Sequence, residues 1–105
     1  MSGGEPRVTV FRSRLRPEAE VEYREWAARI SELARSMPGY VSHKAFEAAD
    51  GERVTIVEFE SEESHRAWAR HPDHLEAQRM GRDSFYLEYS IQVCSVERES
   101  RFPRR

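Results

Sequence analysis

Cysteine, lysine and long apolar runs are nearly absent from this chain. Its 105 residues include one cysteine, Cys94, which excludes an internal disulfide and a zinc site built from several cysteines. No run of 18 apolar residues could span a membrane, and the first residues lack the apolar stretch of a secretory signal. The net charge of −2 argues against general nucleic-acid binding. We therefore expect a cytoplasmic protein that binds neither nucleic acid nor a membrane.

The usual cofactor and nucleophile signatures are also missing. The sequence has no glycine-rich phosphate loop, no Ser-His-Asp order and no flavin or nicotinamide fingerprint. His71 and His74 could approach each other on a helix, but their spacing fixes no third protein ligand for a zinc ion. We predict that the protein has no bound cofactor and no metal, so any redox chemistry would proceed without a nucleotide cofactor.

The material that is present is enough for one domain. Hydrophobic residues make up 38% of the chain, which supplies one modest core. We predict a single domain over residues 1–105, with a core at about 8–97 and an arginine-rich tail at 98–105.

Apolar periodicity predicts the order of the elements. Alternation and β-branched residues indicate strands at 8–15, 40–47, 54–60 and 86–96. Helical spacing indicates one helix from Pro17 to Met37 and a second from about 62 to 83, with a kink or restart at Pro72. The order βαββαβ predicts an α+β, ferredoxin-like fold, with a four-stranded antiparallel sheet and two helices on one face.

Apolar side chains are expected on both faces of this sheet. Val54 and Ile56 alternate with Val57 and Phe59, whereas two helices can cover only one face. A large open apolar face is unusual for a soluble monomer. We therefore predict a homodimer that packs sheet face against sheet face, as a dimeric α/β barrel, and we expect Cys94 to be a small buried hydrophobic residue.

The two helices differ in the side that faces the sheet. The first has an apolar stripe without a polar member, whereas the second, taken as continuous, carries on one stripe Trp68, His71, Leu75, Gln78 and Arg82. Polar groups in a dry core would cost about 1–3 kcal/mol each without partners, so this stripe predicts a wet cleft between the second helix and the sheet. The alternative is a half-exposed helix with Trp68 as its core anchor.

A histidine in such a cleft is a candidate general base, because imidazole takes a proton near neutral pH. His71 is the first candidate because it shares the stripe of Trp68, and His74 lies one position round the helix. For either histidine, the alternative is a capping or packing role at a helix break.

Three stretches carry a family resemblance, which spans residues 8–102. They are Met37-Pro-Gly-Tyr40, Val57-Glu-Phe-Glu-Ser-Glu-Glu-Ser-His-Arg-Ala-Trp68 and His71-Pro-Asp-His74. The chain resembles the antibiotic biosynthesis monooxygenase (ABM) domain family of small dimeric α/β-barrel proteins. The resemblance implies a cofactor-independent monooxygenase that oxidises an aromatic polyketide-like or quinol substrate with O2. Trp68 matches the second-helix tryptophan of this family and would form a wall of the substrate slot.

The remaining site predictions come from the stripe itself. We predict His71, His74 and Arg82 as catalytic residues, a histidine as base and the arginine as stabiliser of an oxyanion. Substrate-binding residues are predicted to be Trp68, Leu75, Gln78 and Tyr86.

Two other functions remain open. One is a non-enzymatic dimeric module that binds a small molecule. The other is haem degradation, since a branch of the same fold pairs the second-helix tryptophan with a histidine ten residues later and with an asparagine on the first strand. Here these positions hold Gln78 and Ser13.

Overall fold

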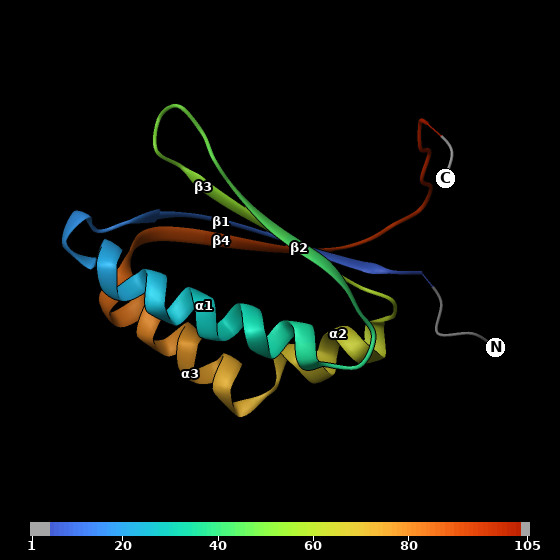
Figure 1. Ribbon diagram of the computed structural model, residues 1–105, viewed down its shortest axis with the longest axis horizontal. Helices are drawn as coiled ribbons and strands as arrows, with labels where there is room; N and C mark the ends of the chain where they lie inside the picture. The colour runs from blue at the N-terminus through green and yellow to red at the C-terminus, as the bar shows by residue number, and fades with distance from the viewer. Residues whose placement is uncertain (1–4, 104–105) are drawn as a thin grey trace.

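Four strands form one antiparallel sheet in the order β2-β3-β1-β4 (Figure 1). The computed structural model describes residues 5–103. The strands are β1 (Arg7–Leu15), β2 (Tyr40–Glu47), β3 (Arg53–Phe59) and β4 (Tyr86–Ser95). The helices are η1 (Pro17–Ala19), α1 (Glu20–Ser36), α2 (Glu62–Ala69), α3 (Pro72–Met80) and the π-helical turn η2 (Gly81–Phe85). The predicted α+β, ferredoxin-like fold with helices on one face is confirmed, and the sheet is open within the chain.

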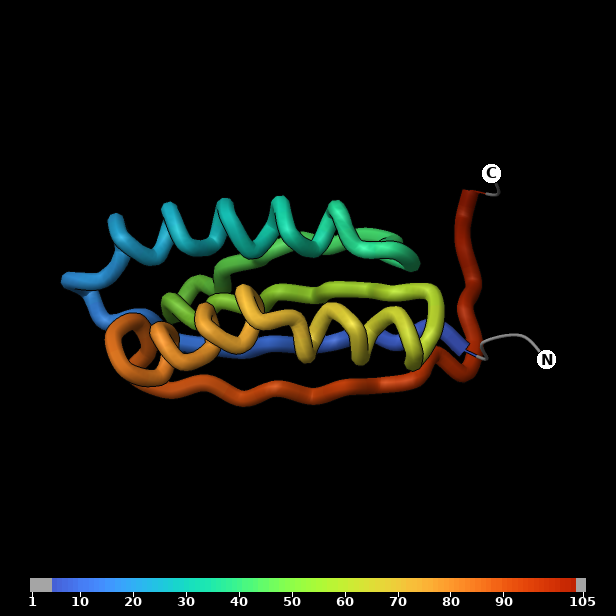
Figure 2. The backbone as a smooth tube through the Cα atoms, turned by 90° about the horizontal axis from the view of Figure 1, so that it is seen from below, coloured from blue at the N-terminus to red at the C-terminus, as the bar shows by residue number. Residues whose placement is uncertain are grey.

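The helices cover the sheet unevenly. Figure 2 shows α1 along β2, and α2 with α3 across β3 and β1, while most of β4 lies at an edge without a helix over it. Tyr89, Ile91 and Val93 of β4 are accordingly exposed, although they face the helix side of the sheet. This uneven cover leaves room between the helices and the sheet.

The second helical segment is divided at Pro72, as the sequence predicted. The proline ring forces the preceding residue out of the helical conformation, and His71 is extended with φ −61° and ψ 135°. Its Nδ1 accepts a hydrogen bond from the backbone N–H of Asp73 at 3.1 Å, so His71 caps α3. The break changes the direction in which residues after Pro72 point, relative to those of α2.

A cluster of buried side chains lies between α1, α2 and β3. Phe59 has no exposed surface and stacks on Trp68, with 5.3 Å between the ring centroids. Ala34 and Val57 complete this cluster. Gly39 joins α1 to β2 with a φ of +84°, and a Cβ there would lie 2.4 Å from the Cβ of Ser64.

The face of the sheet opposite the helices is uncovered and partly apolar. Val57 and Phe59 lie on the opposite face from Ile56, as predicted: the first two are under the helices and Ile56 is on the uncovered face. The register pairs Val10 with Ile56, and it pairs Val8 with Cys94 on the same face. Cys94 is exposed in the single chain, so the prediction that it is buried there is wrong. No helix within residues 5–103 has the length and apolarity needed to cross a membrane.

Candidate functional site

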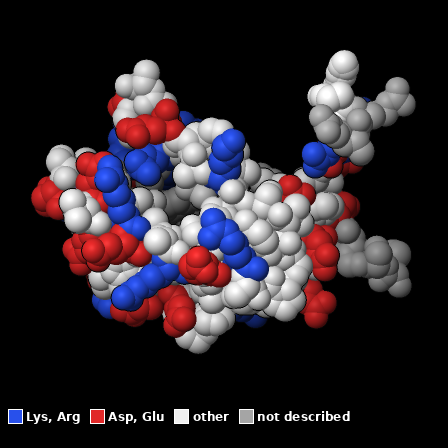
Figure 3. Space-filling view, in the orientation of Figure 1, with Lys and Arg blue, Asp and Glu red and all other residues white. Residues whose placement is uncertain are grey.

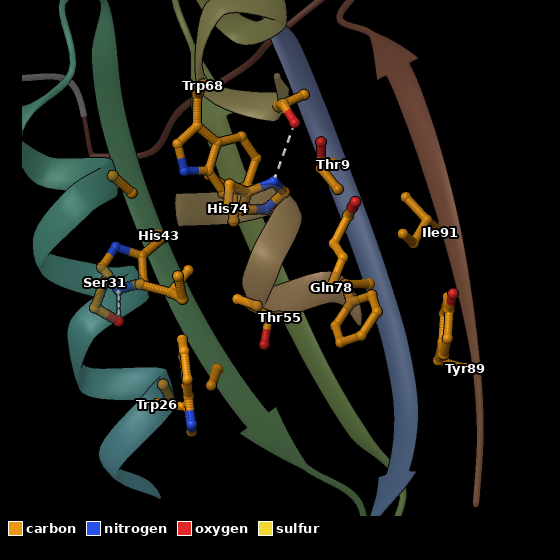
Figure 4. A pocket seen from close by; sticks show the side chains of 18 of the residues that line it. Thr9, Trp26, Ser31, His43, Thr55, Trp68, His74, Gln78, Tyr89 and Ile91 are labelled. Atoms are coloured by element: carbon orange, nitrogen blue, oxygen red, sulfur yellow. Dashed lines mark hydrogen bonds between the residues drawn. The ribbon is translucent and has the colours of Figure 1, made fainter. Parts of the chain in front are cut away.

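A cavity of about 410 Å³ lies between the helices and the sheet (Figure 4). Its volume falls in the range of about 300–1,000 Å³ that is usual for small-molecule sites. Aromatic and aliphatic side chains form most of its wall, including Tyr23, Trp26, Ile30, Trp68, Phe85, Tyr86, Tyr89, Ile91 and Val93. The polar and charged side chains at the wall are Thr9, Ser31, His43, Arg53, Thr55, His65, His74 and Gln78.

Trp68 belongs to both the core and the cavity. Its side chain is only 5% exposed and packs between Phe59 and His74, whose imidazole centroid lies 4.2 Å from the indole. The indole Nε1 is buried and has no hydrogen-bond partner among residues 5–103. The two interpretations of Trp68, as core anchor and as cavity wall, therefore describe different sides of the same ring.

His74 enters the cavity from α3 with one ring nitrogen engaged. Its Nδ1 donates a hydrogen bond to the backbone carbonyl of Ala69 at 3.3 Å, which places the lone pair of the neutral ring on Nε2. Burial lowers the pKa of His74 below its usual 6.5. The hydrogen bond to Ala69 acts in the opposite direction, and the neighbouring His65 and His71 lower the pKa further. The ring is therefore neutral at pH 7 and can accept a proton through Nε2.

Three of the predicted site residues lie outside the cavity wall. His71 caps α3, Leu75 is 49% exposed and Arg82 is exposed on η2. The expected continuous stripe is wrong because Pro72 starts a new helix with a different phase, which directs His74 and Gln78 inward instead. The predicted residues that the structure brings together at the cavity are Trp68, His74, Gln78 and Tyr86.

Arg53 supplies a positive charge at the cavity that the sequence analysis missed. Its guanidinium lies over the ring of Tyr23 at 5.5 Å and forms an ion pair with Glu47 at 3.5 Å. Burial raises the pKa of Tyr86 well above its usual range, with a further contribution from Tyr23, whereas Arg53 acts in the opposite direction. The Tyr86 hydroxyl is therefore a protonated hydrogen-bond donor at any physiological pH. Alternation along β3 could have identified Arg53 as a site residue, because it lies on the same strand face as Thr55 and Val57.

Polar residues also line the cavity from α1, whose inner stripe was expected to be wholly apolar, and from β2, where no site residue was predicted. Ser31 Oγ of α1 lies 3.0 Å from Nε2 of His43, and both side chains line the cavity (Figure 4). The prediction of a wholly apolar inner stripe on the first helix is therefore wrong. His65 forms a further buried contact, with 2.7 Å between its Nε2 and Oγ1 of Thr9, and burial lowers its pKa.

The residues present do not fit the haem-degrading pattern. The position ten residues after Trp68 is Gln78, whose amide is not a usual axial ligand of haem iron. Ser13 on β1 is buried and does not line the cavity. Within residues 5–103, no three or more His, Cys, Asp or Glu side chains are grouped so that they could hold a metal ion.

Acidic and basic side chains are mixed over the surface. The face in Figure 3 shows Lys and Arg interspersed with Asp and Glu, and no broad field of one sign covers it. Many of these charges are paired in the structure, for example Arg12 with Glu52 and Arg14 with Asp50.

Comparisons with known sequences find matches over most of the chain. The model of the family described as antibiotic biosynthesis monooxygenase matches residues 6–80. Uncharacterized protein YqjZ of Bacillus subtilis (strain 168) is 30% identical over 97 residues, which cover 92% of this chain and 85% of that protein.

Solved structures with the same fold include two that nearly the whole chain matches. Rv0793 from Mycobacterium tuberculosis superposes with a TM-score of 0.80 at 21% identity, covering 91% of this chain and 99% of that one. SnoaB, a cofactor-independent oxygenase from Streptomyces nogalater, superposes with a TM-score of 0.78 at 17% identity, covering 96% and 100%. These TM-scores establish the shared fold. The family match covers more than half of the chain. The chain belongs to the antibiotic biosynthesis monooxygenase family.

Proposed function

We propose that the protein is a monooxygenase that oxidises an electron-rich aromatic substrate, such as an anthrone or a quinol, with O2 and without a bound cofactor. The observation that carries the proposal is an aromatic-walled cavity that contains a neutral imidazole, His74, with Nε2 free to take a proton. Family membership supports the reaction class, and the cofactor-independent oxygenase SnoaB shares the fold.

The reaction on an anthrone can be written with the residues of this cavity. Nε2 of His74 removes a proton from the acidic CH2 group, and the electron pair is delocalised onto the ring oxygen as an enolate. The enolate passes one electron to O2, and the two radicals combine through a new C–O bond to give a peroxide anion. This anion takes the proton back from His74 and becomes a hydroperoxide. Removal of the remaining C–H proton and departure of hydroxide then form C=O and water, so that CH2 and O2 become C=O and H2O.

The enolate oxygen needs a positive or hydrogen-bonding partner in the cavity. Arg53 and the protonated Tyr86 hydroxyl lie at the wall and can supply it, whereas the exposed Arg82 does not line the cavity. Trp68 and the other aromatic side chains provide the flat apolar surface that a fused-ring substrate needs.

We also propose that two copies pack through the uncovered sheet face. Phe46 is 48% exposed and Ile56 is 39% exposed, and Val10 lies beside Ile56 in the register. Burying a few hundred Å² of such surface on each copy would contribute several kcal/mol at about 25 cal/mol per Å². This face would become the interior of the predicted dimeric α/β barrel, while the cavity lies on the opposite side of the sheet.

The stoichiometry of O2 uptake tests the proposed reaction. With a hydroxylated anthrone as substrate, we expect the protein to consume one O2 for each quinone formed, at a rate well above that of the buffer. Binding of the anthrone without faster O2 uptake would instead indicate a non-enzymatic binding module.

A further inference from the structure

Tyr40, His43 and Ser31 form a hydrogen-bonded chain that ends at the cavity. The hydroxyl of Tyr40 lies 2.7 Å from Nδ1 of His43, and Nε2 of His43 lies 3.0 Å from Oγ of Ser31. Ser31 comes from α1, whereas Tyr40 and His43 come from β2, so the chain links a helix to the sheet beneath it. Figure 4 shows Ser31 and His43 on the α1 side of the cavity.

The direction of these hydrogen bonds follows from the chemistry of the three groups. Burial lowers the pKa of His43, as does the nearby Arg35, so the ring is neutral at pH 7 and has one N–H and one lone pair. The phenol of Tyr40 is a stronger acid than an aliphatic hydroxyl and makes the shorter contact, so it donates to Nδ1. Nε2–H then donates to Oγ of Ser31, which leaves the hydroxyl proton of Ser31 available.

Ser36, on the same helix, makes a hydrogen bond of a kind that Ser31 does not make within the described part of the chain. Ser36 donates its hydroxyl proton to the backbone carbonyl of Leu33 at 2.7 Å, the usual local use of a helical serine. Among residues 5–103, the Ser31 hydroxyl makes no hydrogen bond with a backbone carbonyl. Its proton is directed instead by His43, at a position that lines the cavity.

We propose that Ser31, oriented by His43 and Tyr40, donates a hydrogen bond to a ring oxygen of the substrate and selects aromatic substrates that carry such an oxygen. This inference rests on the proposed function, because it assigns an orientation to the substrate of the same cavity. The hydroxyl would hold the carbonyl oxygen at the α1 wall while Nε2 of His74 faces the carbon that loses its proton. Ser31 would then be the partner of this oxygen in place of Arg53 or Tyr86. Because charge develops on that oxygen as the enolate forms, the hydrogen bond strengthens during the reaction.

A pair of probes that differ only in oxygen tests this binding directly. The dissociation constants of 9,10-anthraquinone and of anthracene are measured by quenching of tryptophan fluorescence for the wild type, Ser31→Ala and Ser36→Ala. We expect Ser31→Ala to weaken anthraquinone binding about tenfold and to leave anthracene binding within about twofold. Ser36→Ala is the matched control and should bind both probes like the wild type.

A spectroscopic readout separates orientation by His43 from a purely structural role. The 15N shifts of the His43 ring should show the proton on Nε2 in the wild type, and Tyr40→Phe should shift the Nδ1 resonance while the protein stays folded. A proton on Nδ1 of His43 would reverse the direction of the hydrogen bonds and overturn the inference. An equal loss of affinity for anthraquinone and anthracene in Ser31→Ala would also overturn it. O2 uptake by the wild type reports on the proposed oxidation separately, so that failure of that activity does not change the outcome of the binding test.

Discussion

The imidazole of His74 lies 4.2 Å from the indole of Trp68, measured between ring centroids, although the two residues belong to different helices. This contact brings a candidate base against the aromatic wall of the cavity. It exists because Pro72 ends one helix and starts another, so that the residue two positions after the proline, and not His71, faces Trp68.

Replacement of Trp68 should affect stability according to the volume removed. Trp68→Ala removes a buried ring from the contact with Phe59 and should lower the free energy of unfolding by about 3–5 kcal/mol. Trp68→Phe also removes the buried Nε1–H, which has no partner within the described residues, so its cost should be much smaller, about 1 kcal/mol. Urea denaturation followed by circular dichroism measures both values. Equal destabilisation by the two variants would contradict the assignment of Trp68 to the core.

Stability should fall as the solution is acidified below pH 6.5. The pKa values of His43, His65 and His74 are lowered by burial, so the unfolded chain binds protons more readily than the folded one just below pH 6.5. The stabilisation is fully present above pH 6.5 and is lost as the pH falls through the lowered values in the folded state. Urea midpoints between pH 7.5 and pH 5 measure this slope, and His74→Gln should reduce it. An unchanged slope in that variant would mean that His74 is not protected from protonation.

Two glycines with positive φ should respond differently to alanine. Gly39→Ala would place a Cβ 2.4 Å from the Cβ of Ser64, which belongs to the capping box of α2, so both backbone strain and a clash result. Gly51 has a φ of +94° with open space around it, so Gly51→Ala should cost only the conformational strain, about 1 kcal/mol. Thermal unfolding should therefore show a clearly larger loss for Gly39→Ala. A larger loss for Gly51→Ala would contradict the packing of the α1–β2 connection against α2.

A charge on the uncovered sheet face should separate the proposed dimer. Ile56→Glu places a carboxylate between Val10 and Lys44 at the centre of that face, and burying this charge in an apolar interface is unfavourable even beside a lysine. Analytical ultracentrifugation at micromolar concentration should show two-chain particles for the wild type and single chains for the variant. Glu58→Gln, on the same strand face, is a control that should remain a dimer. A wild type that sediments as single chains would refute the interface.

The fold was predictable because it depends on periodicity. Alternation along β3 predicted that Val57 and Phe59 lie on the opposite face from Ile56, and the predicted restart at Pro72 is confirmed. The site was less predictable because it depends on the direction in which each side chain points around the helix axis. The break at Pro72 changes which side of the following helix faces the sheet, and residue spacing alone does not give the size of this rotation. The assumption of a continuous helix therefore favoured His71 over His74. Ser31 was missed although it lies one turn from both Ala27 and Ala34, which also line the cavity.

Arg53 and His43 were missed for a different reason. Both lie on strands, where the sequence analysis considered only apolar side chains when it assigned faces. The register places His43 opposite Val57, which is buried under the helices, so His43 necessarily faces the cavity. A polar residue on the covered face of a sheet is thus a signal that can be read once the strand register is known.

The rates of O2 uptake by His74→Gln and His71→Gln test the central claim most directly. Both variants replace an imidazole with a neutral amide, but only His74 lines the cavity, whereas His71 caps α3. With a hydroxylated anthrone, we predict that His74→Gln lowers kcat by about 100-fold or more, as expected for loss of a general base, while His71→Gln stays within about threefold of the wild type. Equal rates in the wild type and His74→Gln, or a greater loss in His71→Gln, would contradict the account.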